Sequence, residues 1–150
     1  MKATQPSALN KTEVHALLSI AGRNLEGKQI IPKRNYAIIQ LILQTGLRVG
    51  EVVNLQRQDI MFSARAGQVR VVDGKGHKER IIPLNSTARR ALANYLKLRE
   101  ELGATEPIFI SKRGQVPTTR AIQKIISSLA TKANIDRIRV SPHTLLPLII

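Results

Sequence analysis

Residues 68–83 read QVRVVDGKGHKERIIP, and this stretch decides the fold class. Polar and apolar residues alternate from Gln68 to Val71, and a second β-favouring run covers Arg80 to Ile82, so two strands are predicted. Between them, Asp73 to Lys78 contains the glycines that a tight strand connection needs. Asp59 to Phe62 is a candidate third strand. The chain is therefore expected to hold a small antiparallel sheet near its middle.

Upstream of the sheet, apolar residues recur with the period of an α-helix. Asn10 followed by Glu13 is a capping-box pattern and predicts a first helix that begins after Asn10. A loop is expected around Pro32. Tyr36 to Leu43 (YAIIQLIL) is apolar on nearly all sides, which predicts a buried central helix that ends at Gly46.

Downstream of the sheet, two more helices are predicted. Ser86 is a candidate cap for the first of them, and Gly103 is its candidate end. Ile108 to Ile110 is expected to be extended, and the last full helix is expected to begin near Thr118. The predicted architecture is α+β: mostly helical with a small antiparallel three-stranded sheet inserted, rather than an alternating βαβ order.

The totals fit one compact domain of 150 residues. Hydrophobic residues make up 43% and charged residues 23%, so the chain has enough apolar side chains to build a core. It has no cysteine, which excludes disulfides and thiolate metal sites and fits a reducing cytoplasm. No apolar run reaches the roughly 18 residues that span a bilayer, so no membrane partner is expected.

The charge is the most informative total. Lys and Arg number 24 against ten Asp and Glu, which gives a formal net charge of +14. Such an excess repels itself in the folded state, and a polyanionic partner is the usual reason for it. Beyond Glu106 the only acidic residue is Asp136, whereas the basic residues are Lys112, Arg113, Arg120, Lys124, Lys132, Arg137 and Arg139. Nucleic acid is the expected partner, against the alternative of a solubilising surface.

Chemistry on a phosphodiester needs cations on the non-bridging oxygens, a proton donor for the leaving oxygen, and a nucleophile. The segment TGLRVGE, residues 45–51, offers one cation. Arg48 follows a predicted helix end and begins the next helix, where a guanidinium can grip a phosphate with two hydrogen bonds. Glu51, one turn later, could hold Arg48 in place. Taken alone, the segment also fits an ordinary solvated helix end.

The hairpin tip GKGHKER, residues 74–80, offers more cations. Lys75 lies between glycines and can reach beyond the body of the protein, where its ammonium could protonate a departing oxygen. His77, Lys78 and Arg80 beside it favour a hairpin that faces phosphates. An exposed turn is the alternative, and the spacing of a nucleotide-binding P-loop is absent.

A third fragment is SPHTL, residues 141–145. Ser141 and Pro142 resemble a helix opening, which would place His143 at a helix N-terminus. An isolated histidine is more often structural than catalytic, so this fragment gains its meaning only beside the other two.

In this order, TGLRVGE, the GKGHKERIIPL hairpin and SPHTL resemble the catalytic domain of the tyrosine recombinase, or phage integrase, family. The resemblance runs from near Leu9 almost to residue 145. It implies a site-specific recombinase that breaks and rejoins DNA through a 3′-phosphotyrosyl link. It also implies double-stranded DNA as the partner, no ATP, metal or other cofactor, and a cytoplasmic place beside the nucleoid.

The same resemblance assigns roles to individual residues. Arg48 matches the first catalytic arginine, Lys75 the lysine that protonates the 5′-oxygen, and His143 the histidine of an H-x-x-R motif. Glu51 matches the acidic residue that supports the first arginine. The residues that we further expect to contact DNA are His77, Lys78, Arg80, Lys112, Arg113, Arg120 and Lys124.

Towards residue 150 the sequence departs from the family pattern. Leu146 stands where the H-x-x-R motif has its arginine, and Tyr36 and Tyr95 match no family nucleophile. We therefore expect residues 1–150 to be a single partial catalytic domain, without an N-terminal core-binding domain and without the C-terminal segment that carries the nucleophile. Alone it is expected to bind DNA without cleaving it. Full-length relatives tetramerise through that segment, so a monomer is expected.

Two other interpretations stay open on the sequence alone. One is a non-enzymatic DNA-binding regulator or accessory protein, which would bind an inverted repeat in a salt-dependent way. The other is a basic RNA- or ribosome-associated domain, which leaves the TGLR segment and the GKG hairpin unexplained.

Overall fold

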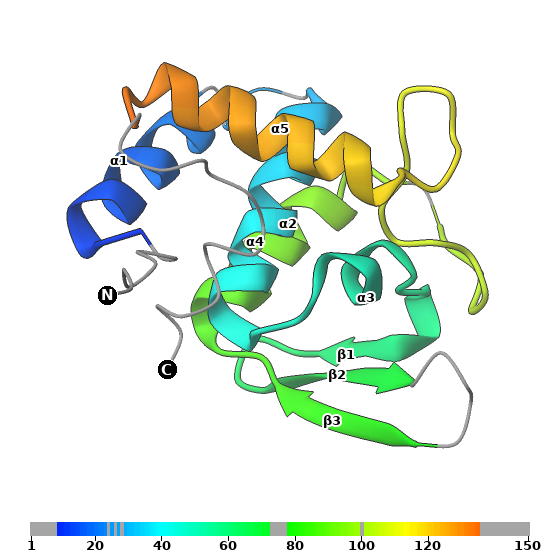
Figure 1. Cartoon of the computed structure of the whole chain (residues 1–150). Coiled ribbons are helices and arrows are strands. Elements are labelled where there is room, and N and C mark those ends of the chain that lie inside the picture. Colours follow the sequence, from blue (N-terminus) through cyan, green and yellow to red (C-terminus); the bar gives the residue numbers. More distant parts are fainter. Residues whose placement is uncertain are drawn as a thin grey trace.

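A computed structural model describes residues 9–135 of the protein, except residues 24, 26, 28, 73–77 and 100. In this part of the chain, helices surround a central helix, and a small antiparallel sheet lies to one side (Figure 1). The elements in chain order are α1 (Lys11–Ala21), α2 (Ile30–Thr45), α3 (Val49–Val53), the 3-10 helix η1 (Arg57–Asp59), β1 (Ile60–Phe62), β2 (Gly67–Val72), β3 (Glu79–Pro83), α4 (Ser86–Leu96) and α5 (Thr119–Lys132). The predicted α+β class, mostly helical with an inserted three-stranded antiparallel sheet, is confirmed.

The central element is α2, whose residues 37–43 are all buried. A helix that is apolar on every side needs partners on every side, and α4, α1 and α3 supply them. The prediction of a buried central helix is confirmed. It ends at Gly46 as predicted, because that residue adopts a left-handed φ of 77° that closes the helix and that a Cβ would strain.

The start of α2 differs from the prediction, because the helix begins at Ile30 and the loop expected around Pro32 is wrong. Pro32 is the third residue of the helix. In the first turn its missing N–H costs no intrahelical hydrogen bond, and its fixed φ already suits a helix. By contrast, α1 begins where predicted, immediately after Asn10.

The strands pair in the order β1-β2-β3, each antiparallel to the next. Val69 and Val71 of β2 are buried, so one face of the sheet covers the core and the other is open. Residues that pair across two strands lie on the same face. Since Val71 pairs with Arg80 and Val69 with Ile82, the side chains of Arg80 and Ile82 lie on the face towards the helices.

The last two helices close the core with one apolar stripe each. The buried side of α4, which includes the fully buried Tyr95, lies against α2. In α5, Ile122 and Ile126 are fully buried, and the helix crosses α1 and α3 (Figure 1). Thr118 caps α5 by accepting a hydrogen bond from the Ala121 N–H at 3.0 Å, so the predicted start of this helix is confirmed.

Both predicted ends of α4 are corrected. Asn85 caps the helix instead of Ser86, because its Oδ1 accepts the Ala88 N–H at 2.9 Å and Ser86 is already helical. The helix ends at Leu96, before Gly103, so that glycine does not terminate it.

The chain bends at residues 108 and 109, whereas residues 108–110 were expected to be extended. Side chains satisfy the carbonyl groups of Ile108 and Ile110. The Tyr95 hydroxyl donates to the Ile108 carbonyl at 2.8 Å, and the Arg34 guanidinium donates to the Ile110 carbonyl at 2.8 Å. Pro107 makes an isolated bridge to Gln56.

Candidate nucleic-acid interface

Arg48 is presented at the junction between α2 and α3. The chain leaves α2 through the left-handed Gly46 and then buries Leu47 completely. Arg48 follows with an extended backbone (φ −76°, ψ 152°) as the residue that caps α3. Its side chain is exposed. A buried anchor immediately before an exposed arginine fixes the main chain while the guanidinium remains accessible to solvent and ligands.

The Arg48 guanidinium is available for an external acceptor. An arginine side chain has only donors, so it cannot accept the hydrogen bond that a capping residue normally accepts from the helix. It also makes no hydrogen bond to any other residue in the described ranges. With five N–H groups in a planar fork, it can hold a phosphate through two of them.

Glu51 links Arg48 to the sheet. Its Oε1 accepts a hydrogen bond from the backbone N–H of Arg48 at 2.9 Å. Its two carboxylate oxygens also accept one hydrogen bond each from the two terminal nitrogens of Arg80, both at 2.9 Å. Burial raises the pKa of the Glu51 carboxyl, but the hydrogen bonds from Arg80 and Arg48 and the charges of both arginines outweigh it, so this pKa lies below its ordinary value. Glu51 is therefore ionised at neutral pH.

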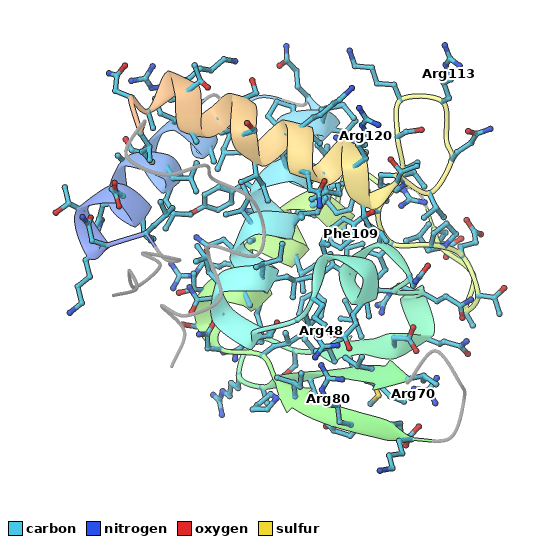
Figure 2. All side chains as sticks on the ribbon, in the orientation of Figure 1. Arg48, Arg70, Arg80, Phe109, Arg113 and Arg120 are labelled. Atoms are coloured by element: carbon cyan, nitrogen blue, oxygen red, sulfur yellow. The ribbon has the colours of Figure 1, made fainter. Side chains whose placement is uncertain are left out.

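Arg80 reaches Glu51 from the second residue of β3, on the sheet face towards the helices. Figure 2 shows Arg48 and Arg80 on the same side of the molecule, where α3 meets the sheet. The hydrogen bond and the charge of Glu51 raise the pKa of Arg80 above its already high value. Glu51 had been expected to hold Arg48; it holds the main chain of Arg48 and the side chain of Arg80.

The open face of the sheet carries a second ion-pair group. Arg70 of β2 contacts Asp59 at 3.1 Å and Glu79 of β3 at 3.6 Å. Glu79 and Arg80 therefore lie on opposite faces of the sheet, and each forms an ion pair at the start of β3. Lys78, immediately before β3, is exposed. Lys75 and His77 of the predicted hairpin tip, and His143 of the SPHTL segment, lie outside the described residues.

The other predicted DNA contacts lie apart from Arg48. Lys112 and Arg113 belong to the loop before α5, and Arg120 and Lys124 to its first two turns; all four are exposed. In Figure 2, Arg113 and Arg120 lie at the opposite end of the molecule from Arg80. The structure thus separates the predicted basic residues into two groups, one beside the sheet and one along α5 and the loop before it.

Several residues that fix the segment before the basic loop were missed by sequence reasoning. Arg34 of α2 is only 6% exposed, and it hydrogen-bonds the Ile110 carbonyl just before the loop. Burial lowers the pKa of Arg34, partly offset by Tyr95. Arg99 donates to the Pro107 carbonyl at 3.0 Å, and the Tyr95 ring stacks on Phe109 at 5.4 Å. The signal available in the sequence was the position of Arg34, which falls at helical spacing on the same apolar face as Ile38 and Leu41.

The described ranges contain neither a membrane-spanning helix nor a candidate metal site. No helix there is long and apolar enough to cross a membrane. No group of three or more histidine, aspartate or glutamate side chains is close enough to hold a metal ion, when only these residues are searched.

Comparison with known proteins identifies the family of this chain. The model of the phage integrase family matches residues 7–145. The chain belongs to the phage integrase family. Among curated relatives, it is 36% identical to the tyrosine recombinase XerD of Halalkalibacterium halodurans over 96% of the chain and 48% of the relative. It is also 36% identical to the tyrosine recombinase XerC of Myxococcus xanthus over 95% of the chain and 47% of the relative.

Solved structures of recombinases share the fold of this integrase-family chain. The crystal structure of XerA recombinase superposes with a TM-score of 0.81 at 30% identity, covering 99% of this chain and 50% of that one. XerH site-specific recombinase bound to its difH substrate gives a TM-score of 0.81 at 22% identity, which supports the fold alone. The chain spans about half the length of the curated relatives and solved chains that it matches.

Proposed function

We propose that this chain supplies the phosphate-binding part of the catalytic site of a site-specific DNA recombinase. The observation that carries the proposal is the exposed Arg48 guanidinium, which makes no hydrogen bond to other described residues and whose main chain is fixed by Leu47 and Glu51. Membership of the phage integrase family and the similarity to the Xer recombinases support it.

The proposed division of labour follows the needs of phosphoryl transfer. Arg48 would hold the non-bridging oxygens of the scissile phosphate, where negative charge grows in the transition state. Lys75 would give its proton to the 5′-oxygen that leaves, and His143 would assist in proton transfer and phosphate contact. The proposal calls for no cofactor, and it places the chain at the DNA of the nucleoid.

Double-stranded DNA is the proposed partner of both basic groups. Lys78, beside the hairpin, would contact the backbone near the scissile phosphate. Lys112, Arg113, Arg120 and Lys124 would contact backbone phosphates further along the duplex. Because such contacts release counterions, the affinity should fall steeply as salt rises. By itself the chain is proposed to act as a monomer formed by one partial catalytic domain.

The test is the affinity of the 150-residue chain for a nicked duplex, measured by fluorescence anisotropy over a range of salt concentrations. Arg48→Ala should weaken binding about tenfold, the size expected for a lost charged hydrogen bond. The slope of log affinity against log salt should fall by about one. The matched control is Arg23→Ala, which removes the same charge from an exposed position after α1. Equal losses in both variants would reduce Arg48 to general surface charge and reject the proposal.

A further inference from the structure

Among the described residues, Arg80 differs from its exposed neighbour Lys78 because its guanidinium is already paired with a carboxylate. Both of its terminal nitrogens donate to Glu51, each at 2.9 Å, in the two-point geometry that arginine prefers for a carboxylate. Its side chain is 51% exposed, and that of Glu51 is 22% exposed. Exposure alone would suggest a DNA contact, but both terminal nitrogens of Arg80 already donate to Glu51.

The partner of Arg80 is the residue that fixes Arg48. Glu51 Oε1 accepts from the Arg48 N–H and from Arg80, so one oxygen atom joins the start of α3 to β3. On the open face of the sheet, Arg70 contacts the neighbouring Glu79 at 3.6 Å, so β3 is fixed from the other side as well.

We infer that Arg80 is a positioning residue that fixes β3 to the start of α3, and so to Arg48, through Glu51, rather than a residue that contacts DNA phosphate. The inference rests on the proposed function, because it concerns the phosphate site that Arg48 would form. Arg48 can hold a phosphate well only if its main chain keeps its place. Glu51 fixes that main chain, and the two-point ion pair with Arg80 anchors Glu51 to β3.

Two substitutions that conserve net charge test the inference. Arg80→Lys keeps the positive charge but cannot make two parallel hydrogen bonds to a carboxylate. Glu51→Asp keeps the negative charge on a side chain one methylene shorter, which pulls it away from Arg80. Each variant should bind the nicked duplex roughly threefold more weakly than the parent chain, the loss expected from one partly exposed ion pair. A full-affinity Arg80→Lys chain would overturn the inference.

The decisive comparison combines each variant with Arg48→Ala. If Arg80 acts through Arg48, Arg80→Lys should cause no further loss of affinity in the Arg48→Ala background, and Glu51→Asp should behave in the same way. An equal loss in both backgrounds would mean that Arg80 contacts DNA itself, and would overturn the inference. Arg23→Lys, which makes the same exchange at the exposed position after α1, is the control and should keep its affinity in both backgrounds.

The outcomes separate this inference from the proposed function. If Arg48→Ala binds as well as the parent chain, the proposed function fails. If Arg48→Ala loses affinity while the two effects are additive, the positioning role fails alone. A general loss of structure would change the salt slope when Arg80→Lys is added to the Arg48→Ala background and would overturn the inference, whereas positioning leaves that slope unchanged.

Discussion

Helices α1 and α3 both begin with a glutamate at their third position, but the residues before them differ in kind. At α1 the exchange is reciprocal: the Asn10 N–H donates to Glu13 at 2.9 Å, and the Asn10 side chain accepts from the Glu13 N–H at 2.8 Å. At α3 the Arg48 N–H donates to Glu51 at the same 2.9 Å, and nothing is returned. The second helix keeps half of the motif.

The missing capping hydrogen bond lowers the stability of α3, and the residue that cannot make it is a donor for anions. A capping side chain such as asparagine contributes about 1 kcal/mol to helix stability, which an arginine cannot supply. Glu51 also makes an ion pair with Arg80, which joins the start of α3 to the sheet. Departures from local stability rules concentrate at functional sites. The comparison therefore indicates that α1 is capped for stability, whereas the start of α3 serves to present a guanidinium.

The sharpest way to break the comparison is to give α3 the residue that caps α1. Arg48→Asn should lower the affinity for nicked DNA about tenfold, because the charged donors are lost. The same change should raise the free energy of unfolding by up to about 1 kcal/mol, because asparagine accepts the missing hydrogen bond. Anisotropy and urea denaturation measure the two effects. A chain that gained stability and kept its affinity would contradict the functional interpretation of α3.

The reciprocal change removes the cap of α1. Asn10→Ala should lower the free energy of unfolding by about 1 kcal/mol in urea titrations, because the Glu13 N–H loses its acceptor. DNA affinity should be unchanged in conditions where the chain stays folded. If Asn10→Ala and Arg48→Asn weakened DNA binding equally, the distinction between the two helix starts would fail.

A smaller effect is expected from pH, through Glu51. Its pKa is lower in the folded chain than in the unfolded one, so its stabilising contribution is complete above the unfolded value, about 4.3, and is lost as the pH falls through the folded value. At neutral pH, Glu51→Gln should be less stable than the parent chain by under about 1 kcal/mol, since the pair is partly exposed. The difference in stability between the two chains should shrink as the pH falls below the unfolded value, and a gap that stays constant in acid would count against the ion pair.

Local signals made much of the fold predictable. The Asn10–Glu13 pattern, the apolar run before Gly46 and the alternation in β2 each depend on neighbouring residues, and each element forms where expected. The loop around Pro32 was wrong because proline breaks a helix interior and fits its first turn equally well. The pattern could not distinguish the two positions.

The site was predictable in its residues but not in their pairing. The TGLRVGE segment indicated Arg48 and Glu51, and the hairpin indicated Arg80. Glu51 and Arg80 are 29 positions apart in the sequence, and their contact depends on β3 lying beside α3, which no local pattern encodes. Arg34 was missed for a similar reason, because its acceptor is the carbonyl of Ile110, on a segment far along the chain.

The central claim, that the Arg48 guanidinium binds a DNA phosphate, is tested most directly by NMR of the arginine Nε–Hε groups while nicked duplex is added. The Arg48 resonance, assigned by its absence from Arg48→Lys, should shift and become protected from exchange with water, whereas that of Arg23 should not. If Arg48 stays unperturbed while arginines elsewhere on the chain respond to the DNA, the account is wrong.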